Sequence, residues 1–132
     1  MSMMEYTSAS MIVTLDDSFD THSVSKMRAF LEDIVNNPKR DNVVLDASEV
    51  VFLDSSGIGA LVFLYKRLAE KGRSLHIVGL AGQPADIIRT LRIDRTLKTH
   101  ESLNIYLAQE QSITEKTSAV SYAKPNKLQT QN

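Results

Sequence analysis

Residues 42–65 read NVVLDASEVVFLDSSGIGALVFLY, and this stretch decides the fold. Its first part, Val43-Val44-Leu45, is a short, wholly apolar run without alternation, which is typical of a strand buried on both faces. The polar turn Asp54-Ser55-Ser56-Gly57 follows after a second short apolar run. The residues beyond the turn are apolar at helical spacing. The stretch therefore predicts a buried strand, a polar turn and a helix, in that order.

The segments on either side of this stretch alternate in the same way. Working outward, the sequence predicts a strand over 11–15 paired with a weaker strand over 3–8, an amphipathic helix over 24–35 ended by Pro38, a strand over 75–78, a helix from Pro84 through Leu91, a short strand over 97–99, and a last helix from Ser102 to about Gln109. Strands that alternate with helices indicate an α/β domain. We expect one mixed, mostly parallel sheet of four to five strands with about four helices.

The chain has 132 residues, which is the size of one domain. Residues 1–111 carry the hydrophobic periodicity and are predicted to form that domain. Residues 112–132 are mainly Ser, Thr, Lys, Gln and Asn, and they hold too few apolar side chains to fold alone. We interpret them as a polar, flexible C-terminal tail.

Composition argues against several classes of function. The formal net charge is −1, which gives no support for nucleic-acid binding. The longest apolar stretch, residues 58–65, is far shorter than the ~20 residues that span a bilayer, so we expect no membrane insertion and a cytoplasmic location. Cysteine is absent, and the three histidines are scattered. We therefore expect neither a metal site nor any cofactor.

The central stretch resembles the STAS domain family, in particular its anti-sigma-factor antagonists. The resemblance lies in the buried strand Val43–Asp46, the run Phe52-Leu53-Asp54-Ser55-Ser56-Gly57-Ile58-Gly59 and the apolar helix that follows. Ser18-Phe19-Asp20 is similar to the family's element at the start of the first helix. The resemblance covers roughly residues 4–110.

The resemblance implies a phosphorylation switch rather than an enzyme. Ser56 matches the serine that a partner kinase, of anti-sigma type, phosphorylates in such proteins. The unmodified protein binds that partner, the phosphorylated protein does not, and a serine phosphatase resets the switch. Asp20, Asp54, Ser55 and Gly57 would surround Ser56. Relatives of this type act in signal transduction, on sigma factors in transcription regulation or on biofilm and stress output.

Helical spacing adds an argument that does not depend on the family. Ile58, Leu61, Val62, Tyr65 and Leu68 share one side of the helix and are predicted to face the core. The other side carries Ser56, Gly59, Ala60, Phe63 and Arg67. Small residues let a partner approach closely, and an aromatic side chain can anchor it, so this side can be a docking strip that includes Gly59 and Phe63. Burial of Phe63 by a neighbouring helix explains the pattern equally well.

Three other interpretations of the serine turn stay open at this point. The turn can be a plain helix cap, in which a side-chain oxygen accepts from backbone N–H groups. The protein can be a constitutive STAS subunit of a transport or lipid-transfer complex, which needs no phosphate turnover. A serine hydrolase is the third, although the nucleophile elbow G-x-S-x-G is only half present around Ser55.

Overall fold

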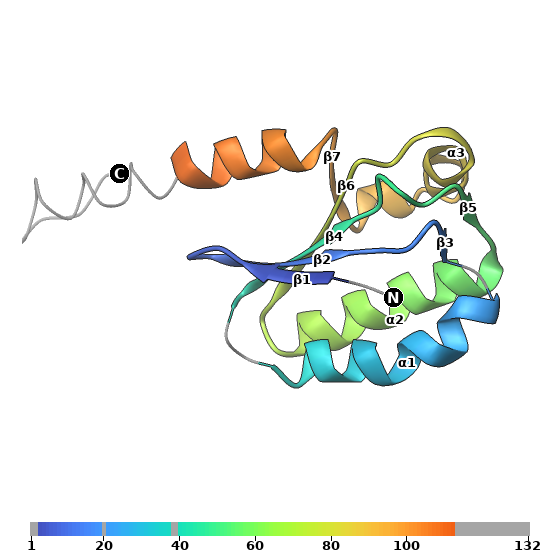
Figure 1. Cartoon of the computed structure of the whole chain (residues 1–132), viewed down its shortest axis with the longest axis horizontal. Coiled ribbons are helices and arrows are strands. Elements are labelled where there is room, and N and C mark those ends of the chain that lie inside the picture. The colour runs from blue at the N-terminus through green and yellow to red at the C-terminus, as the bar shows by residue number, and fades with distance from the viewer. Residues whose placement is uncertain (1–2, 20, 38–39, 113–132) are drawn as a thin grey trace, which may run out of the picture.

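The computed structural model describes residues 3–19, 21–37 and 40–112, which form one α/β domain (Figure 1). Its elements are β1 (Met3–Tyr6), β2 (Ser10–Thr14), β3 (Ser18–Phe19), α1 (Thr21–Val35), β4 (Asn42–Asp46), β5 (Phe52–Leu53), α2 (Ser55–Glu70), β6 (Ser74–Val78), α3 (Gly82–Thr90), a 3-10 turn (Ile93–Arg95), β7 (Lys98–His100) and a helix over 103–112, here called the C-terminal helix.

The main sheet has five strands in the order β1-β2-β4-β6-β7. β1 pairs antiparallel with β2, and the other three pairings are parallel. The short strands β3 and β5 pair with each other in parallel and form a separate two-stranded sheet. The predicted mixed, mostly parallel sheet and the four helices are therefore confirmed.

Side chains of the central strands alternate between two apolar layers. Met11, Val13, Val43 and Leu45 belong to the larger core, on the face that α1 and α2 cover. Ile12, Val44 and Val78 form a smaller cluster with Tyr106 of the C-terminal helix on the other face. Burial on both faces is why the three central residues of β2 and of β4 are all apolar instead of alternating with polar residues.

The side of α2 that faces the core matches the side that its spacing predicted only in part: Leu61 and Leu68 are buried as expected. Its buried residues are Gly57, Ala60, Leu61, Leu64 and Leu68. Ile58, Val62 and Tyr65, predicted as core, are only partly buried. The helix contacts both the sheet and α1, so its buried stripe is shifted toward α1 and takes in Ala60.

Arg73 holds the end of α1 against the start of β6. This buried side chain donates from Nη1 to the carbonyl oxygens of Ile34 and Val35, at 3.0 and 3.1 Å, and from Nε to that of Arg40 at 2.9 Å. Desolvation lowers the Arg73 pKa, and the nearby Asp41 carboxylate acts in the opposite direction. The guanidinium thereby satisfies carbonyls that a helix leaves unpaired at its C-terminus.

The remaining sequence predictions concern α3, the C-terminal helix, the tail and membrane insertion. α3 begins at Gly82, which places Pro84 in its first turn as expected. Ser102 accepts from the N–H of Ile105 and caps the C-terminal helix, which runs through residue 112. Residues 113–132 lie outside the described residues, so the flexible tail stays a prediction. No helix in the described part of the chain is both long and apolar enough to cross a bilayer.

Candidate functional site: the first turn of α2 and its groove

Asp54 caps α2 and fixes the orientation of the serine turn. Its backbone is extended, its carboxylate oxygen accepts from the N–H of Gly57 at 2.9 Å, and its carbonyl accepts from the N–H of Ile58 at 2.9 Å. Ser55 and Ser56 are consequently the first two helical residues. The interpretation of the turn as a cap is correct, but Asp54 provides the cap, so neither serine is needed for that role.

The strand that leads into the cap is held from two sides. Ser18 and Phe19 of β3 pair with Phe52 and Leu53 of β5. On the other side, Leu53 donates its N–H to Gln83 Oε1 and accepts from Gln83 Nε2, both at 2.8 Å. The amide of Gln83 thus takes the place of a neighbouring strand. Together these contacts fix the chain immediately before Asp54.

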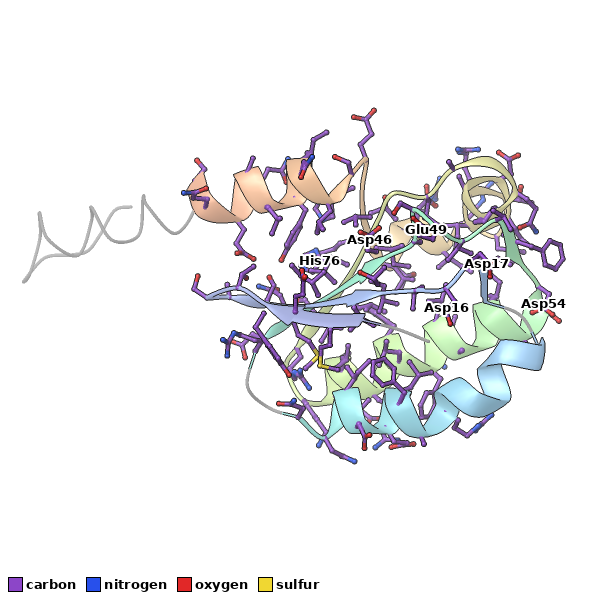
Figure 2. All side chains as sticks on the ribbon, viewed as in Figure 1. Asp16, Asp17, Asp46, Glu49, Asp54 and His76 are labelled. Carbon is purple, nitrogen blue, oxygen red and sulfur yellow. The ribbon has the colours of Figure 1, made fainter. Side chains whose placement is uncertain are left out.

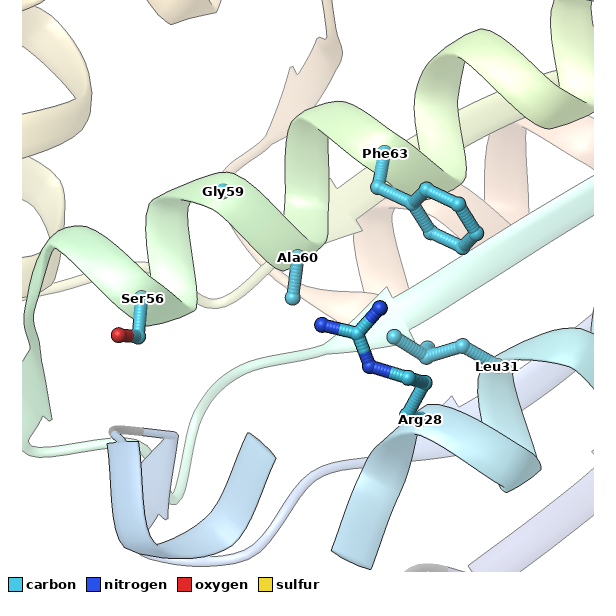
Figure 3. A pocket seen from close by; sticks show the side chains of 6 residues that line it. All are labelled: Arg28, Leu31, Ser56, Gly59, Ala60 and Phe63. Carbon is cyan, nitrogen blue, oxygen red and sulfur yellow. The ribbon is translucent and has the colours of Figure 1, made fainter. Parts of the chain in front are cut away.

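The side of α2 that carries Ser56 borders a groove against α1. The groove encloses ≈ 310 Å³ and is lined by Arg28, Leu31, Ser56, Gly59, Ala60 and Phe63 (Figure 3). Ser56 is half-buried at one end of the groove, Gly59 is exposed, and Phe63 is half-buried. A methyl group on Gly59 would meet no atom within 4 Å, so the space beside this glycine is open. The groove therefore presents an apolar wall next to a serine hydroxyl.

Arg67 closes the far end of the same strip. Its guanidinium lies over the Phe63 ring, 5.4 Å from the centroid, and pairs with Glu32 of α1 at 3.2 Å. Phe63 is therefore covered in part by Arg67. Ala60 is only 8% exposed, whereas Gly59 and part of Phe63 stay accessible, so docking along this strip stays a prediction.

Negative charge gathers at the end of the molecule where α2 begins. Asp16 and Asp17 follow β2, and Asp54 follows β5, so all three lie near the carboxyl ends of their strands (Figure 2). Val51 and Phe52 add apolar surface there, with 68% and 47% of their area exposed. The first turn of α2 thus lies near acidic side chains and close in sequence to two exposed apolar ones.

The structure brings most of the predicted site residues together. Asp54, Ser55, Ser56 and Gly57 form the cap and first turn, and Gly59 and Phe63 continue along the groove. Gly57 is buried, so it shapes the turn from within. Asp20 follows β3 directly but lies outside the described residues. Whether a partner contacts these residues stays a prediction.

Two contributors were missed by the sequence predictions. Gln83 contacts Leu53 from thirty residues away, and Arg28 reaches the groove from α1. No local pattern identifies either residue, because each acts on a segment that only the tertiary fold brings near.

A second polar cluster lies under the C-terminal helix. His76 Nδ1 is 3.0 Å from His100 Nε2, its Nε2 is 3.2 Å from Asn42 Oδ1, and both rings pack against Tyr106. The Tyr106 hydroxyl is 2.6 Å from Ser10 Oγ, which also bonds to Glu110. Among the described residues, no cluster of three His, Asp or Glu side chains is suited to hold a metal ion.

The titration of this cluster follows from its burial. Desolvation, with smaller contributions from His100 and Lys98, lowers the pKa of His76 to about 4, and Glu110 opposes the shift. Desolvation and then Lys98 lower the pKa of His100, and desolvation raises that of Tyr106. Both histidines are therefore neutral near pH 7. Both rings pack on Tyr106, which belongs to the cluster on the other face of the sheet from the groove, so neither can serve as a base for Ser56. Figure 2 shows His76 on that face.

The comparison with known families agrees with the fold. Residues 2–106 match the model of the STAS domain. The chain belongs to the STAS domain family. A Paenibacillus polymyxa protein named anti-sigma F factor antagonist is 27% identical to this STAS chain over 74 residues. That match covers 56% of this chain and 63% of the relative, so the alignment spans less than two thirds of the relative's length.

Solved structures show the same fold at low sequence identity. A putative anti-sigma factor antagonist from Thermotoga maritima superposes with a TM-score of 0.75 at 15% identity, covering 82% of this chain and 92% of that one. The Bacillus cell fate determinant SpoIIAA in its phosphorylated form superposes with a TM-score of 0.61 at 15% identity, covering 87% and 98%. The fold of this STAS chain is thus the fold found in these proteins.

Proposed function

We propose that this STAS domain is a partner-switching regulator controlled by phosphorylation of Ser56. In the unmodified state, the groove between α1 and α2 binds a protein partner of anti-sigma type that has serine kinase activity. The partner transfers the γ-phosphoryl group of a nucleoside triphosphate to Ser56 Oγ, releasing the diphosphate, while the hydroxyl proton leaves to a base of the kinase. A serine phosphatase removes the group again.

The observation that carries this proposal is the position of Ser56 at the end of the groove, beside the open space at Gly59. A phosphate there adds about −1.5 to −2 charges at the mouth of an apolar surface. Burying such a charge against a partner costs far more than burying a hydroxyl. The modification therefore blocks docking without needing to alter the fold. Helix α2 is capped by Asp54 and not by Ser56, so a phosphate on Ser56 leaves the cap in place.

Ser55 provides the matched control for the test, because it is the neighbouring serine and is exposed. Intact-mass spectrometry of the protein from its native host should show one added phosphate in wild type and in Ser55→Ala, and none in Ser56→Ala. The partner co-purified with wild type should bind Ser56→Asp at least about tenfold more weakly, since like charges and desolvated charge both oppose docking.

Two outcomes would overturn the proposal in favour of its rivals. Co-purification with a membrane complex, with binding unchanged in Ser56→Asp and no phosphate under any growth condition, points to a constitutive STAS subunit. Covalent labelling of Ser56 by a serine-reactive probe, together with turnover of a simple ester, points to a serine hydrolase. No described histidine lines the groove, which is why the binding role is preferred.

A further inference from the structure

Arg28 faces the same groove as Ser56 from the opposite helix. Figure 3 shows its guanidinium extending from α1 to a position beside Ala60, with Ser56 nearer the beginning of α2. Ser56 and Ala60 are four residues apart, so they lie one above the other on one face of the helix, with Cβ atoms about 5–6 Å apart. The guanidinium and the Ser56 side chain thus line one groove from opposite helices.

Arg28, which lines the groove, and Arg67, which lies over Phe63, differ in how they are held. Arg67 is engaged by Glu32 and by the Phe63 ring. Arg28 is exposed and makes no hydrogen bond or ion pair with another described residue. An exposed, flexible side chain can move along the groove by one turn at little cost. Among the described residues that line the groove, Arg28 is therefore the cation that is available to a new anion.

We propose that Arg28 binds the phosphate monoester on Ser56 and thereby closes the groove with an ion pair between α1 and α2. This inference rests on the proposed function, because it assumes Ser56 as the modified residue. A phosphoserine offers three acceptor oxygens, and the guanidinium presents its N–H donors as a planar fork that matches two of them. In the phosphorylated protein, which does not bind the partner, the ion pair then fills the groove in addition to the charge that the phosphate brings.

The environment of Ser56 gives the phosphate a reason to turn toward Arg28. The N–H of Gly57, which the end of a helix would offer to an anion, already donates to the Asp54 carboxylate. That carboxylate also repels a phosphate two residues away. A phosphate that leans along the groove moves away from Asp54 and toward the guanidinium. Its path passes Gly59, where the open space receives it without displacing a side chain.

The test uses the full chain with phosphoserine placed at position 56 during translation, so that no kinase is needed. The pH titration of the ³¹P chemical shift reports the second pKa of the phosphate. A neighbouring cation favours the dianion, so the wild-type midpoint should be lower than that of Arg28→Ala by about half a pH unit or more, roughly threefold in proton affinity. Arg28→Lys keeps the charge and should recover part of the shift.

Arg67→Ala is the matched control, since it removes an equal charge from the residue that lies over Phe63, next to the groove. Its midpoint should stay within about 0.1 unit of wild type, because Arg67 is already paired with Glu32. Equal midpoints for wild type and Arg28→Ala overturn the inference, and so does an equal shift in Arg67→Ala. Partner binding by the same phosphoproteins tests the proposed function separately. If the phosphorylated protein binds the partner as tightly as the unphosphorylated protein does, the switch is refuted. The ³¹P titration still decides the role of Arg28 in that case.

Discussion

At the scale of single residues, the Gln83 side chain hydrogen-bonds to the backbone of Leu53 as a neighbouring strand would. Its amide accepts from and donates to the same backbone unit, at 2.8 Å in both bonds. This contact lies directly before the cap at Asp54. The position of Ser56 consequently depends on an amide from α3, an element outside the motif that identifies the turn.

Replacing Gln83 with Leu should lower the free energy of unfolding by about 1–3 kcal/mol. The change removes two hydrogen bonds and leaves the part-buried N–H and carbonyl of Leu53 without their partner. Urea denaturation followed by circular dichroism measures the effect. Gln111→Leu, on the exposed end of the C-terminal helix, should stay within about 0.5 kcal/mol of wild type. A loss no larger than that of this control argues against the clamp.

A substitution at Gly59 should change the stability of the domain and its affinity for the partner in opposite directions. Leucine has a higher helix propensity than glycine, and the space beside Gly59 is open, so Gly59→Leu should raise the free energy of unfolding by about 0.5–1 kcal/mol. The added side chain occupies the groove, and partner affinity should fall at least about tenfold. Calorimetry with the purified partner measures the second effect.

Ala69→Leu is the control, because Ala69 is exposed near the other end of the same helix. This variant should bind the partner as wild type does. If Gly59→Leu also binds with wild-type affinity, the groove is not the docking surface.

At the scale of whole elements, the end of α3 carries the strained position. Arg92 has φ 60° and ψ 26°, which places a side chain in the left-handed region directly after the helix and its C-cap Leu91. Such a conformation costs about 1–2 kcal/mol for a residue other than glycine. The N–H of Arg92 donates to the carbonyl of Arg89 at 3.0 Å and the Arg92 carbonyl accepts from the N–H of Arg95 at 3.2 Å, so this left-handed residue joins the end of α3 to the 3-10 turn.

Arg92→Gly should therefore raise the free energy of unfolding by about 0.5–1 kcal/mol, after the greater freedom of glycine in the unfolded chain is deducted. Arg89→Gly makes the same chemical change inside α3, where φ is helical, and should lower it by about 1 kcal/mol. Thermal denaturation of both variants measures the contrast. Equal losses in the two proteins would contradict the assignment of strain to Arg92.

Elements were predictable from sequence where one physical cause dominates, and less so where tertiary packing decides. The apolar runs of β2 and β4 identify themselves because both faces are buried, and the serine turn identifies the start of α2. The buried side of α2 was predicted in part, since its contact with α1 changes which residues are covered. Arg73, which bonds to Ile34 and Val35 across nearly forty residues, leaves no local signal at all.

At the scale of the whole molecule, the stability of the fold should depend on the neutral state of His76. Folding lowers the pKa of this imidazole from 6.5 to about 4, mainly by desolvation. Between these values the unfolded chain binds more protons than the folded one, so stability is complete above pH 6.5 and declines as the pH falls toward 4. Lys98 and His100 add to the penalty for protonating His76, and Glu110 reduces it.

Urea midpoints measured between pH 7.5 and 4.5 check this prediction. The wild-type midpoint should decrease over this range, and His76→Gln, which cannot take up the proton, should flatten the part of the curve between pH 6.5 and 4.5. A wild-type midpoint that stays level across this range would show that the buried imidazole is not linked to folding. As the pH falls, backbone amides of the C-terminal helix should be the first to lose protection against hydrogen exchange, because Tyr106 of that helix packs on the His76 ring.

The serine turn of α2 and the histidine cluster under the C-terminal helix lie at opposite ends of the parallel strands. Ser10 and Asn42, which contact the C-terminal helix or the histidines beneath it, begin β2 and β4, whereas the first turn of α2 lies at the end where these strands finish. Figure 1 shows the C-terminal helix extending away from the first turn of α2. A fluorescent label on Gln111, an exposed residue of that helix, is therefore remote from the groove. A label at that site can follow complex assembly by anisotropy without entering the groove.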